Sequence, residues 1–268
     1  HLISRPTWTS NALPGDWQCI YFSNDVVPGT IMDNCVVQYG GQSYSANVYI
    51  YSSQPTIRRS KIQYSSGNGI YSYYGNPYIQ SNTISDNQTH GIQIDGNVVP
   101  ANLEFNNIVN NPVGVYCNAS LKPILRNNNI SNNPNYGGQN IYQFTITDAQ
   151  VNWWGDASGP FDGSTIGLYN PTGLGNTVTD YIDYSNWLTS NPLVAGQIPA
   201  VKLFSNLVQP QILDLKQYSV DSIASWSYQP DININQAHLD IKPDNTVDYL
   251  YTNTPTFVGV DTVTFTAN

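Results

Sequence analysis

The first half of this chain is constrained most by a pattern that returns about every 22 residues. Each copy has a proline or alanine, an aliphatic residue two positions later, Asn or Ser at position six and an aliphatic residue at position eight. Successive copies are separated by 22, 24 and 22 residues (Pro55/Ile57/Ser60/Ile62, Pro77/Ile79/Asn82/Ile84, Ala101/Leu103/Asn106/Ile108, Pro123/Leu125/Asn128/Ile130). Such a fixed period is typical of a solenoid, in which each period forms one coil.

A second pattern keeps the same phase between these copies. It is a small residue, an aliphatic residue and then usually a tyrosine (Asn47–Tyr49, Gly69–Tyr71, Gly91–Gln93, Gly114–Tyr116, Asn140–Tyr142, with Cys19–Tyr21 one coil earlier). Two or three short strands per period predict a parallel β-helix of six or seven rungs, whose strands pair about 4.8 Å apart. Its corner asparagines are expected to stack between rungs, each amide bonding to the next.

Composition agrees with an all-β chain. The 268 residues include 33 Asn and 20 Tyr but only one Met and one Glu, so strong helix formers are scarce. Only 10% of the residues are charged and the net charge is −9, which argues against a nucleic-acid or anionic-membrane partner. No apolar run approaches the roughly 18 residues of a membrane span.

The repeats resemble those of the right-handed parallel β-helix, or pectate-lyase-like, family of microbial surface proteins. The resemblance rests on the repeats, on the early segments, and on a closing segment (Pro14–Trp17, Ile20–Phe22, Val37–Gly41, Val151–Gly155, Ser158–Pro160). It implies a β-helix over residues 1–165 with a Trp-rich C-terminal cap. A cap extension and linker are expected over 166–199. The tryptophans are expected to cover the open end of the solenoid, where strands and core are otherwise exposed.

Residues 200–268 carry six strand-like segments, which suggest a small β-sandwich. Gly259–Ala267 resembles the ending of the Ig-like or cadherin-like repeats of microbial surface proteins. In that family another strand usually follows, so the sandwich is expected to lack its last strand, which either a cut removes or a neighbouring molecule donates by β-augmentation. The predicted fold class is therefore all-β: a right-handed parallel β-helix followed by an Ig-like β-sandwich.

The second pattern predicts a row of tyrosines on one outer face of the solenoid. Its members are taken as candidate binding residues (Tyr21, Tyr49, Tyr71, Tyr116 and Tyr142, with Tyr51 and Tyr73 two residues further along their strands). Three interpretations remain open. Tyrosine can simply favour strand surfaces, the rings can dock a second copy or another surface protein, or they can stack on sugars.

The sequence contains no complete set of residues for a lyase or a glycosidase. Arg58, Arg59 and Lys61 form a basic cluster without the neighbouring acidic trio that a Ca²⁺-dependent lyase would use. Glu104 and Arg126 are expected one rung apart and able to pair. Asp86 and Asp95 fall on a turn and on the tyrosine face, so no carboxylate pair of a glycosidase is evident.

No metal site or cofactor is predicted from the residues. His1, His90 and His238 have no metal-ligand spacing, and Asp231–Asn235 lacks the glycine and distal glutamate of a calcium loop. The resemblance to the sandwich family alone implies Ca²⁺.

Three cysteines allow one disulfide or three buried thiols (Cys19, Cys35, Cys117), and three Asn-x-Ser/Thr sequons are glycosylation candidates (Asn87, Asn118, Asn129).

The sequence thus favours a non-catalytic structural or adhesive module, extracellular or at a cell surface. Its expected partners are further copies, other surface proteins or a polysaccharide. A filament joined by strand donation is one form of this hypothesis. The alternative is a carbohydrate-active protein, a polysaccharide lyase or a carbohydrate-binding domain, that uses the same tyrosine face.

Overall fold

The computed structural model describes residues 2–3, 12–96, 99–192, 209–214, 226–230, 237–243, 246–252 and 263–267. The chain divides into two units, His1–Val194 and Ala195–Asn268. The described residues form strands and turns without a helix. In this described part there is accordingly no helix with the length and apolar character of a membrane span.

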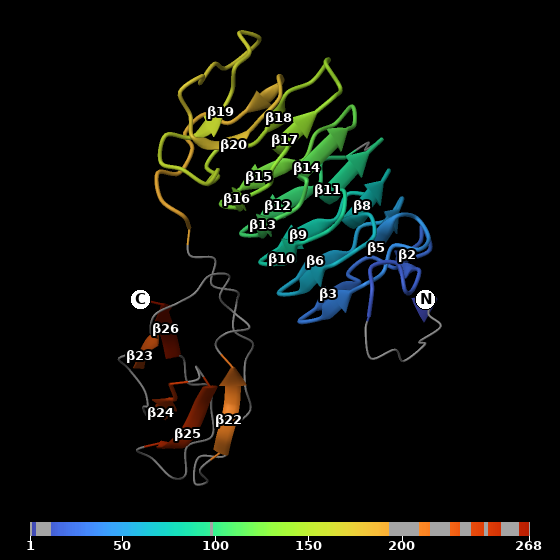
Figure 1. The fold of residues 1–268 in the computed structure, drawn as a ribbon. Coiled ribbons are helices and arrows are strands. Elements are labelled where there is room, and N and C mark those ends of the chain that lie inside the picture. The colour runs from blue at the N-terminus through green and yellow to red at the C-terminus, as the bar shows by residue number, and fades with distance from the viewer. Residues whose placement is uncertain are drawn as a thin grey trace. The chain divides into compact units, whose positions relative to one another are not determined.

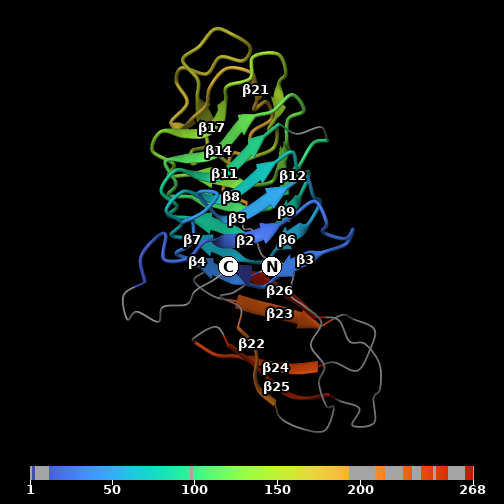
Figure 2. The ribbon, with the colours of Figure 1, turned by 90° about the vertical axis from the view of Figure 1, so that its right-hand side faces the viewer.

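Three sheets run the length of the first unit (Figures 1 and 2). The first, called sheet A, has seven strands, all parallel except that β1 is antiparallel to β2. Its strands follow one another rung by rung: β1 (Leu2–Ile3), β2 (Cys19–Phe22), β5 (Ala46–Tyr51), β8 (Asn68–Tyr73), β11 (His90–Asp95), β14 (Val113–Asn118) and β17 (Tyr136–Asn140).

Sheets B and C are parallel throughout. Sheet B contains β3 (Ile31–Asp33), β6 (Thr56–Arg58), β9 (Tyr78–Gln80), β12 (Asn102–Glu104), β15 (Ile124–Arg126), β18 (Thr147–Asp148) and β21 (Ile182–Asp183). Sheet C contains β4 (Val36–Gln38), β7 (Lys61–Gln63), β10 (Thr83–Ser85), β13 (Asn107–Val109) and β16 (Asn129–Ser131).

A complete turn of the solenoid uses one strand from each sheet. The described residues contain five such turns, from β3–β4–β5 to β15–β16–β17. β2 lies before them, and β18 and β21 lie after them in sheet B. The expectation of six or seven rungs was therefore too high, because the flanking segments supply single strands rather than whole turns.

The repeated aliphatic residues fill the interior. Each is at most 1% exposed and lies in register with its equivalent in the next rung (Ile57, Ile79, Leu103 and Leu125 on sheet B; Ile62, Ile84, Ile108 and Ile130 on sheet C; Val48, Ile70, Ile92 and Val115 on sheet A). Burial of these stacked side chains is the main favourable term for the solenoid.

Asparagines stabilise the corner between sheets B and C. Asn106 is fully buried, and its Oδ1 accepts hydrogen bonds from the backbone N–H and the Nδ2 of Asn82, both at 3.0 Å. Its own Nδ2 donates to the Ile79 carbonyl (2.8 Å) and to Asn128 Oδ1 (3.0 Å). Asn152 continues this corner ladder. Stacked corner asparagines, expected from the repeats, are thus present, and they satisfy backbone groups where the chain leaves a strand.

The cap differs from a regular rung. At the position that holds Val115 in the previous rung, β17 has Gly138. A Cβ built on Gly138 would lie 3.0 Å from Ile182 Cδ1, and the Trp154 ring lies close behind it. Trp154 is fully buried. Trp154 and Ile182 therefore occupy the space that an aliphatic side chain of the last rung would fill.

The described strands of the second unit form two antiparallel sheets. One contains β22 (Gln209–Asp214), β25 (Thr246–Thr252) and β24 (Ala237–Ile241), and the other contains β23 (Trp226–Pro230) and β26 (Val263–Ala267). Residues 201–204, the first of the six strand-like segments expected from sequence, lie outside the described residues, as do Asp231–Asn235 and His1.

Candidate functional site: the aromatic face of sheet A

Sheet A presents its outer face through two columns of residues in register. The first column reads Tyr21, Tyr49, Tyr71, Gln93, Tyr116 and Gln139, and the second reads Tyr51, Tyr73, Asp95 and Asn118. These strands lie one above another in Figure 2. Among these outward positions Asp95 carries the only formal charge. The face therefore offers aromatic rings and neutral polar groups to its surroundings.

Tyr142 does not belong to this face, contrary to the expectation from sequence. Tyr116 pairs with Gln139, and β17 ends at Asn140, before Tyr142 is reached. The error arose because Gly138 replaces the aliphatic residue that marks the other rungs, so Ile141 took its place in the alignment of the repeats. Tyr142 instead contacts Phe144 edge to face at 5.4 Å and lies below the Lys122 ammonium at 4.9 Å.

The tyrosines of β2, β5 and β8 form one connected cluster. Tyr44 stacks on Tyr49 with ring centroids 4.4 Å apart and an interplanar angle of 14°, and Tyr21 contacts both rings. Tyr71 meets Tyr49 edge to face at 5.2 Å. These are favourable aromatic geometries. We call these rings, together with Tyr51, Tyr73 and Tyr74, the aromatic cluster.

The aromatic cluster is less exposed than the sequence suggested. Tyr49 is only 7% exposed because its neighbours cover it, whereas Tyr44 is 50% and Tyr74 is 44% exposed. Burial raises the pKa of Tyr49 to about 12. The outer surface of the cluster is thus made largely by Tyr44 and Tyr74, two residues that the repeat pattern did not single out.

Tyr44 and Tyr74 escape the repeat pattern because each lies outside a strand. Both adopt a left-handed backbone conformation, with φ of 57° and 56°. Tyr74 follows the last residue of β8, where the chain turns away from the sheet. That position was recoverable in principle, since it comes directly after Tyr73. Tyr44 lies in the irregular connection before β5, and no periodic signal marks it.

A polar network interrupts the tyrosine column at β11. The Tyr71 hydroxyl donates to Asp95 Oδ2 at 2.9 Å, and Gln93 Nε2 donates to the same oxygen at 2.8 Å. Asn68 Nδ2 in turn donates to Gln93 Oε1 at 2.9 Å. Burial, together with the hydrogen bond to Asp95, raises the pKa of Tyr71. Sequence reasoning missed this network because Gln93 looked like a lapse in the tyrosine pattern.

His90 closes the same network. Its ring stacks on Tyr116 with centroids 4.6 Å apart, and its Nδ1 lies 2.7 Å from Asn68 Oδ1. Burial lowers the pKa of His90. The imidazole is held by contacts on two sides, which suits a structural role at the edge of the aromatic face.

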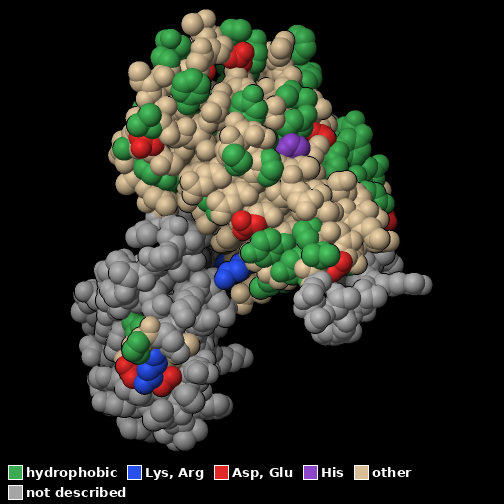
Figure 3. Space-filling model, in the orientation of Figure 1, with side chains coloured by type: hydrophobic (Ala, Val, Ile, Leu, Met, Phe, Trp, Pro, Cys, Tyr) green, Lys and Arg blue, Asp and Glu red, His purple; other side chains and the backbone are tan. Residues whose placement is uncertain are grey.

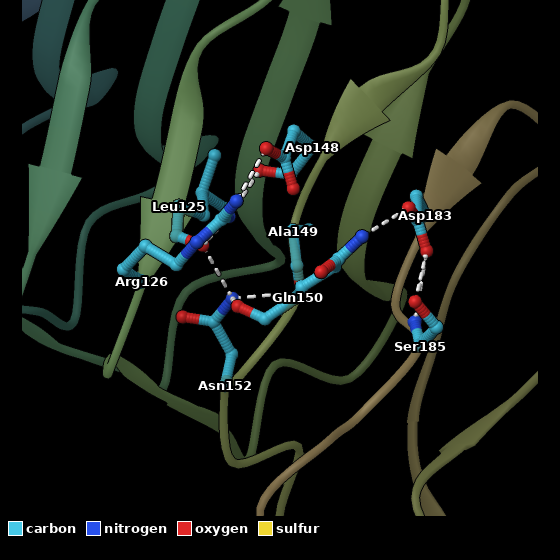
Figure 4. Close-up of polar contacts among 8 residues, drawn as sticks. All are labelled: Leu125, Arg126, Asp148, Ala149, Gln150, Asn152, Asp183 and Ser185. Carbon is cyan, nitrogen blue, oxygen red and sulfur yellow. Dashed lines mark hydrogen bonds and ion pairs between the residues drawn. The ribbon is translucent and has the colours of Figure 1, made fainter.

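The ion pairs found among the described residues of the first unit lie at sheet B. Arg58 and Arg59 both bind the Asp33 carboxylate, and the hydrogen bond from Arg59 is the main cause that lowers the pKa of Asp33. Glu104 lies in register with Arg126, as expected, but it accepts a hydrogen bond from the Tyr78 hydroxyl at 2.7 Å. Arg126 pairs with Asp148 instead (Figure 4).

Asp183 was not considered from sequence, yet β21 places it next to Asp148 in register. Gln150 Nε2 donates to Asp183 Oδ2 at 2.6 Å, and Ser185 donates to Oδ1 through its hydroxyl and its backbone N–H (Figure 4). Burial alone would raise the pKa of Asp183, but these hydrogen bonds lower it. Such a carboxylate is ill suited to donate a proton as a general acid.

The described residues contain no group of three His, Cys, Asp or Glu side chains that could hold a metal ion. Cys19, Cys35 and Cys117 are free thiols. Burial raises the pKa of Cys19 to about 11 and that of Cys117 to about 12, so neither is an activated nucleophile. Charged side chains are sparse on the side of the first unit seen in Figure 3.

Residues 7–152, over half of the chain, match the sequence profile of the right handed beta helix region. The chain belongs to the right-handed beta helix family. Comparisons with curated proteins and with solved structures returned no match. In this β-helix the matched residues include all of the aromatic cluster and β11, whereas Asp183 lies beyond them. Because one fold of this kind hosts many functions, the family assigns the architecture, and the function must be argued from the site.

Proposed function

We propose that this β-helix protein is a non-catalytic structural or adhesive module, extracellular or at a cell surface, that self-associates through the aromatic face of sheet A. The aromatic cluster spans the three successive rungs of β2, β5 and β8. Tyrosine suits such a surface because its ring supplies apolar area while its hydroxyl keeps a hydrogen-bonding group at the rim.

The observation that carries this proposal is that the aromatic cluster contains both buried and half-exposed tyrosine rings. Tyr49 is held between Tyr21, Tyr44 and Tyr71, so the rings beneath the surface are already ordered. Tyr44 stacks on Tyr49 and Tyr74 meets Tyr73 edge to face, and both Tyr44 and Tyr74 remain half exposed. Preordered aromatic anchors lose little conformational entropy on association, which favours binding. The absence of Lys and Arg from the outward columns leaves a face without strong self-repulsion.

We propose further that the second unit is an Ig-like module. Its two antiparallel sheets, β22–β25–β24 and β23–β26, have the strand content of a small sandwich. Addition of a strand from another copy to an exposed sheet edge would link molecules into a filament. Electron microscopy of the concentrated protein would show ordered polymers if this form of the proposal is correct, and dispersed particles if it is not.

Sedimentation equilibrium tests the role of the aromatic face. We expect wild-type protein to self-associate, and the double variant Tyr44→Asn/Tyr74→Asn to associate at least about tenfold more weakly, as loss of hot-spot residues implies. Asparagine suits both sites because it tolerates a left-handed backbone. Tyr169→Asn is the matched control, since Tyr169 is 58% exposed but lies in the cap. A monomeric wild type, or equal association of all three proteins, would contradict the proposal.

The alternative is carbohydrate binding or cleavage. It is favoured by one observation: the polar residues Gln93 and Asp95 lie between Tyr71 and Tyr116, an arrangement that could hydrogen-bond sugar hydroxyls beside aromatic rings. Depolymerisation of a uronic-acid polysaccharide would support a lyase, and its loss in Arg126→Ala would place the chemistry on sheet B and not on the tyrosine face. Saturable glycan binding without cleavage, lost in Gln93→Ala, would support a binding domain.

A further inference from the structure

The three sequons of this chain lie in different environments. Asn87 is 2% exposed and belongs to a second asparagine ladder, where its Nδ2 donates to Asn111 Oδ1 at 2.9 Å and its Oδ1 accepts from the Ser65 backbone N–H at 3.0 Å. Asn129 is also 2% exposed, and its Nδ2 donates to Asn107 Oδ1 at 2.6 Å. In the folded chain neither Nδ2 is available to form a new covalent bond.

Asn118 differs from Asn87 and Asn129 in its exposure and in its hydrogen bonding. It is the exposed last residue of β14, and its side chain makes no hydrogen bond among the described residues. The sequon Asn118-Ala119-Ser120 leaves the strand and enters a bend, in which Ser120 and Leu121 are also exposed. The acceptor is exposed at the end of its strand and the chain then leaves the sheet, so a transferase can reach Asn118 in the folded protein.

We propose that Asn118 is an N-glycosylation site and that, of the three sequons, it alone accepts a glycan in the folded protein. The donor would be a polyprenyl-phosphate-linked oligosaccharide. A bond forms between Asn118 Nδ2 and the anomeric carbon of the first sugar. The bond from that carbon to the phosphate oxygen breaks, the phosphate leaves with the electron pair, and Nδ2 loses one proton.

The position of Asn118 gives this modification a consequence for the aromatic face. Asn118 pairs with Asp95 in register and continues the outward column of Tyr51 and Tyr73. A glycan there extends from β14, the last strand but one of sheet A, beside Tyr116. It leaves Tyr71, Tyr73 and Tyr74 two rungs away, and Tyr44 with the rings of β5 and β2 three or more rungs away. The modification would therefore limit the contact surface to the aromatic cluster without covering it.

Intact-mass and glycopeptide analysis of the full chain, secreted from cells that carry an oligosaccharyltransferase, tests the proposal. We expect one glycan per molecule, located on the peptide that contains Asn118. Asn118→Gln and Ser120→Ala should each abolish it, the second without altering the acceptor asparagine. Ser131→Ala, which removes the Asn129 sequon, is the matched control and should leave the glycan in place.

Several results would overturn the proposal. These are a chain without any glycan, a glycan on Asn87 or Asn129 of the folded protein, or a glycan that survives Ser120→Ala. The measurement does not depend on self-association, so it can fail while the aromatic face proves functional, and the reverse also holds.

Discussion

Asn176 binds Asn133 as though it were the next rung of the solenoid, although 43 residues separate them in sequence. Asn176 Oδ1 accepts hydrogen bonds from the backbone N–H and the Nδ2 of Asn133, both at 3.1 Å. The second ladder, which runs from Ser65 through Asn87 and Asn111, therefore ends on a cap residue instead of on water. The cap continues the hydrogen bonding of the rungs after their regular sequence has stopped.

The ladders should contribute measurably to stability. Asn106→Asp keeps the shape of the side chain but replaces the Nδ2 donor, which faces the Ile79 carbonyl and Asn128 Oδ1. We expect a loss of about 2–4 kcal/mol in the free energy of unfolding at neutral pH, because buried acceptors lose their donor and a carboxylate is buried. Denaturant titration measures this. Asn102→Ala, on the outer face of β12, should cost under about 0.5 kcal/mol, and equal losses in both variants would contradict the role of the ladder.

The stability of the cap should depend on the indole of Trp154. Trp154 is fully buried and packs against Gly137 and Gly138. Trp154→Ala should lower the free energy of unfolding by about 3–5 kcal/mol, because it opens a cavity over the last rung. Thermal unfolding followed by circular dichroism is the measurement. Tyr169→Ala, an exposed cap residue, serves for comparison, and a Trp154→Ala protein as stable as this control would show that the indole does not close the solenoid.

Alkaline pH should weaken the aromatic cluster. The pKa of Tyr49 is raised by burial from 10.0 to about 12, so the folded state favours the neutral phenol. The corresponding stability is fully present below pH 10 and is lost as the pH rises towards 12. Tyr49→Phe, which keeps the ring but cannot ionise, should flatten this part of the stability curve. An unchanged alkaline transition in Tyr49→Phe would mean that this phenol does not control it.

Acid should weaken the ion pairs of Asp33 on sheet B. The hydrogen bond from Arg59, aided by Arg58, lowers the pKa of Asp33 below its ordinary value of 3.8. Stability from this group is present above that value and is lost as the pH falls through the lowered pKa. Asp33→Asn should therefore reduce stability at pH 7 and reduce its further decline on acidification. Parallel acid-unfolding curves for the two proteins would exclude the contribution.

Much of the first unit could be predicted from sequence, because a solenoid places equivalent residues in the same environment in every turn. Ile57, Ile79 and Leu103 occupy equivalent sites, so one repeated pattern indicates their common environment. Prediction failed where the repeat itself changes. Gly138 replaces an aliphatic residue because Trp154 fills its space, and this displaced Tyr142 from the predicted tyrosine row.

The candidate site was predictable only in part. The tyrosines within strands follow from the period, whereas Tyr44 reaches the cluster from an irregular connection that has no equivalent in the other rungs. Asp183 joins sheet B through β21, far along the chain from its neighbour Asp148. Contacts of this kind depend on how the cap folds back, which no short pattern encodes.

Hydroxyl-radical footprinting of the full chain at low and high protein concentration tests the contact surface most directly. If the aromatic face of sheet A mediates association, oxidation of Tyr44, Tyr73 and Tyr74 should fall at least about threefold at the higher concentration, as burial at an interface core requires. Oxidation of Tyr169 in the cap should stay unchanged. Association that leaves Tyr44 and Tyr74 as reactive as in the monomer would contradict the account.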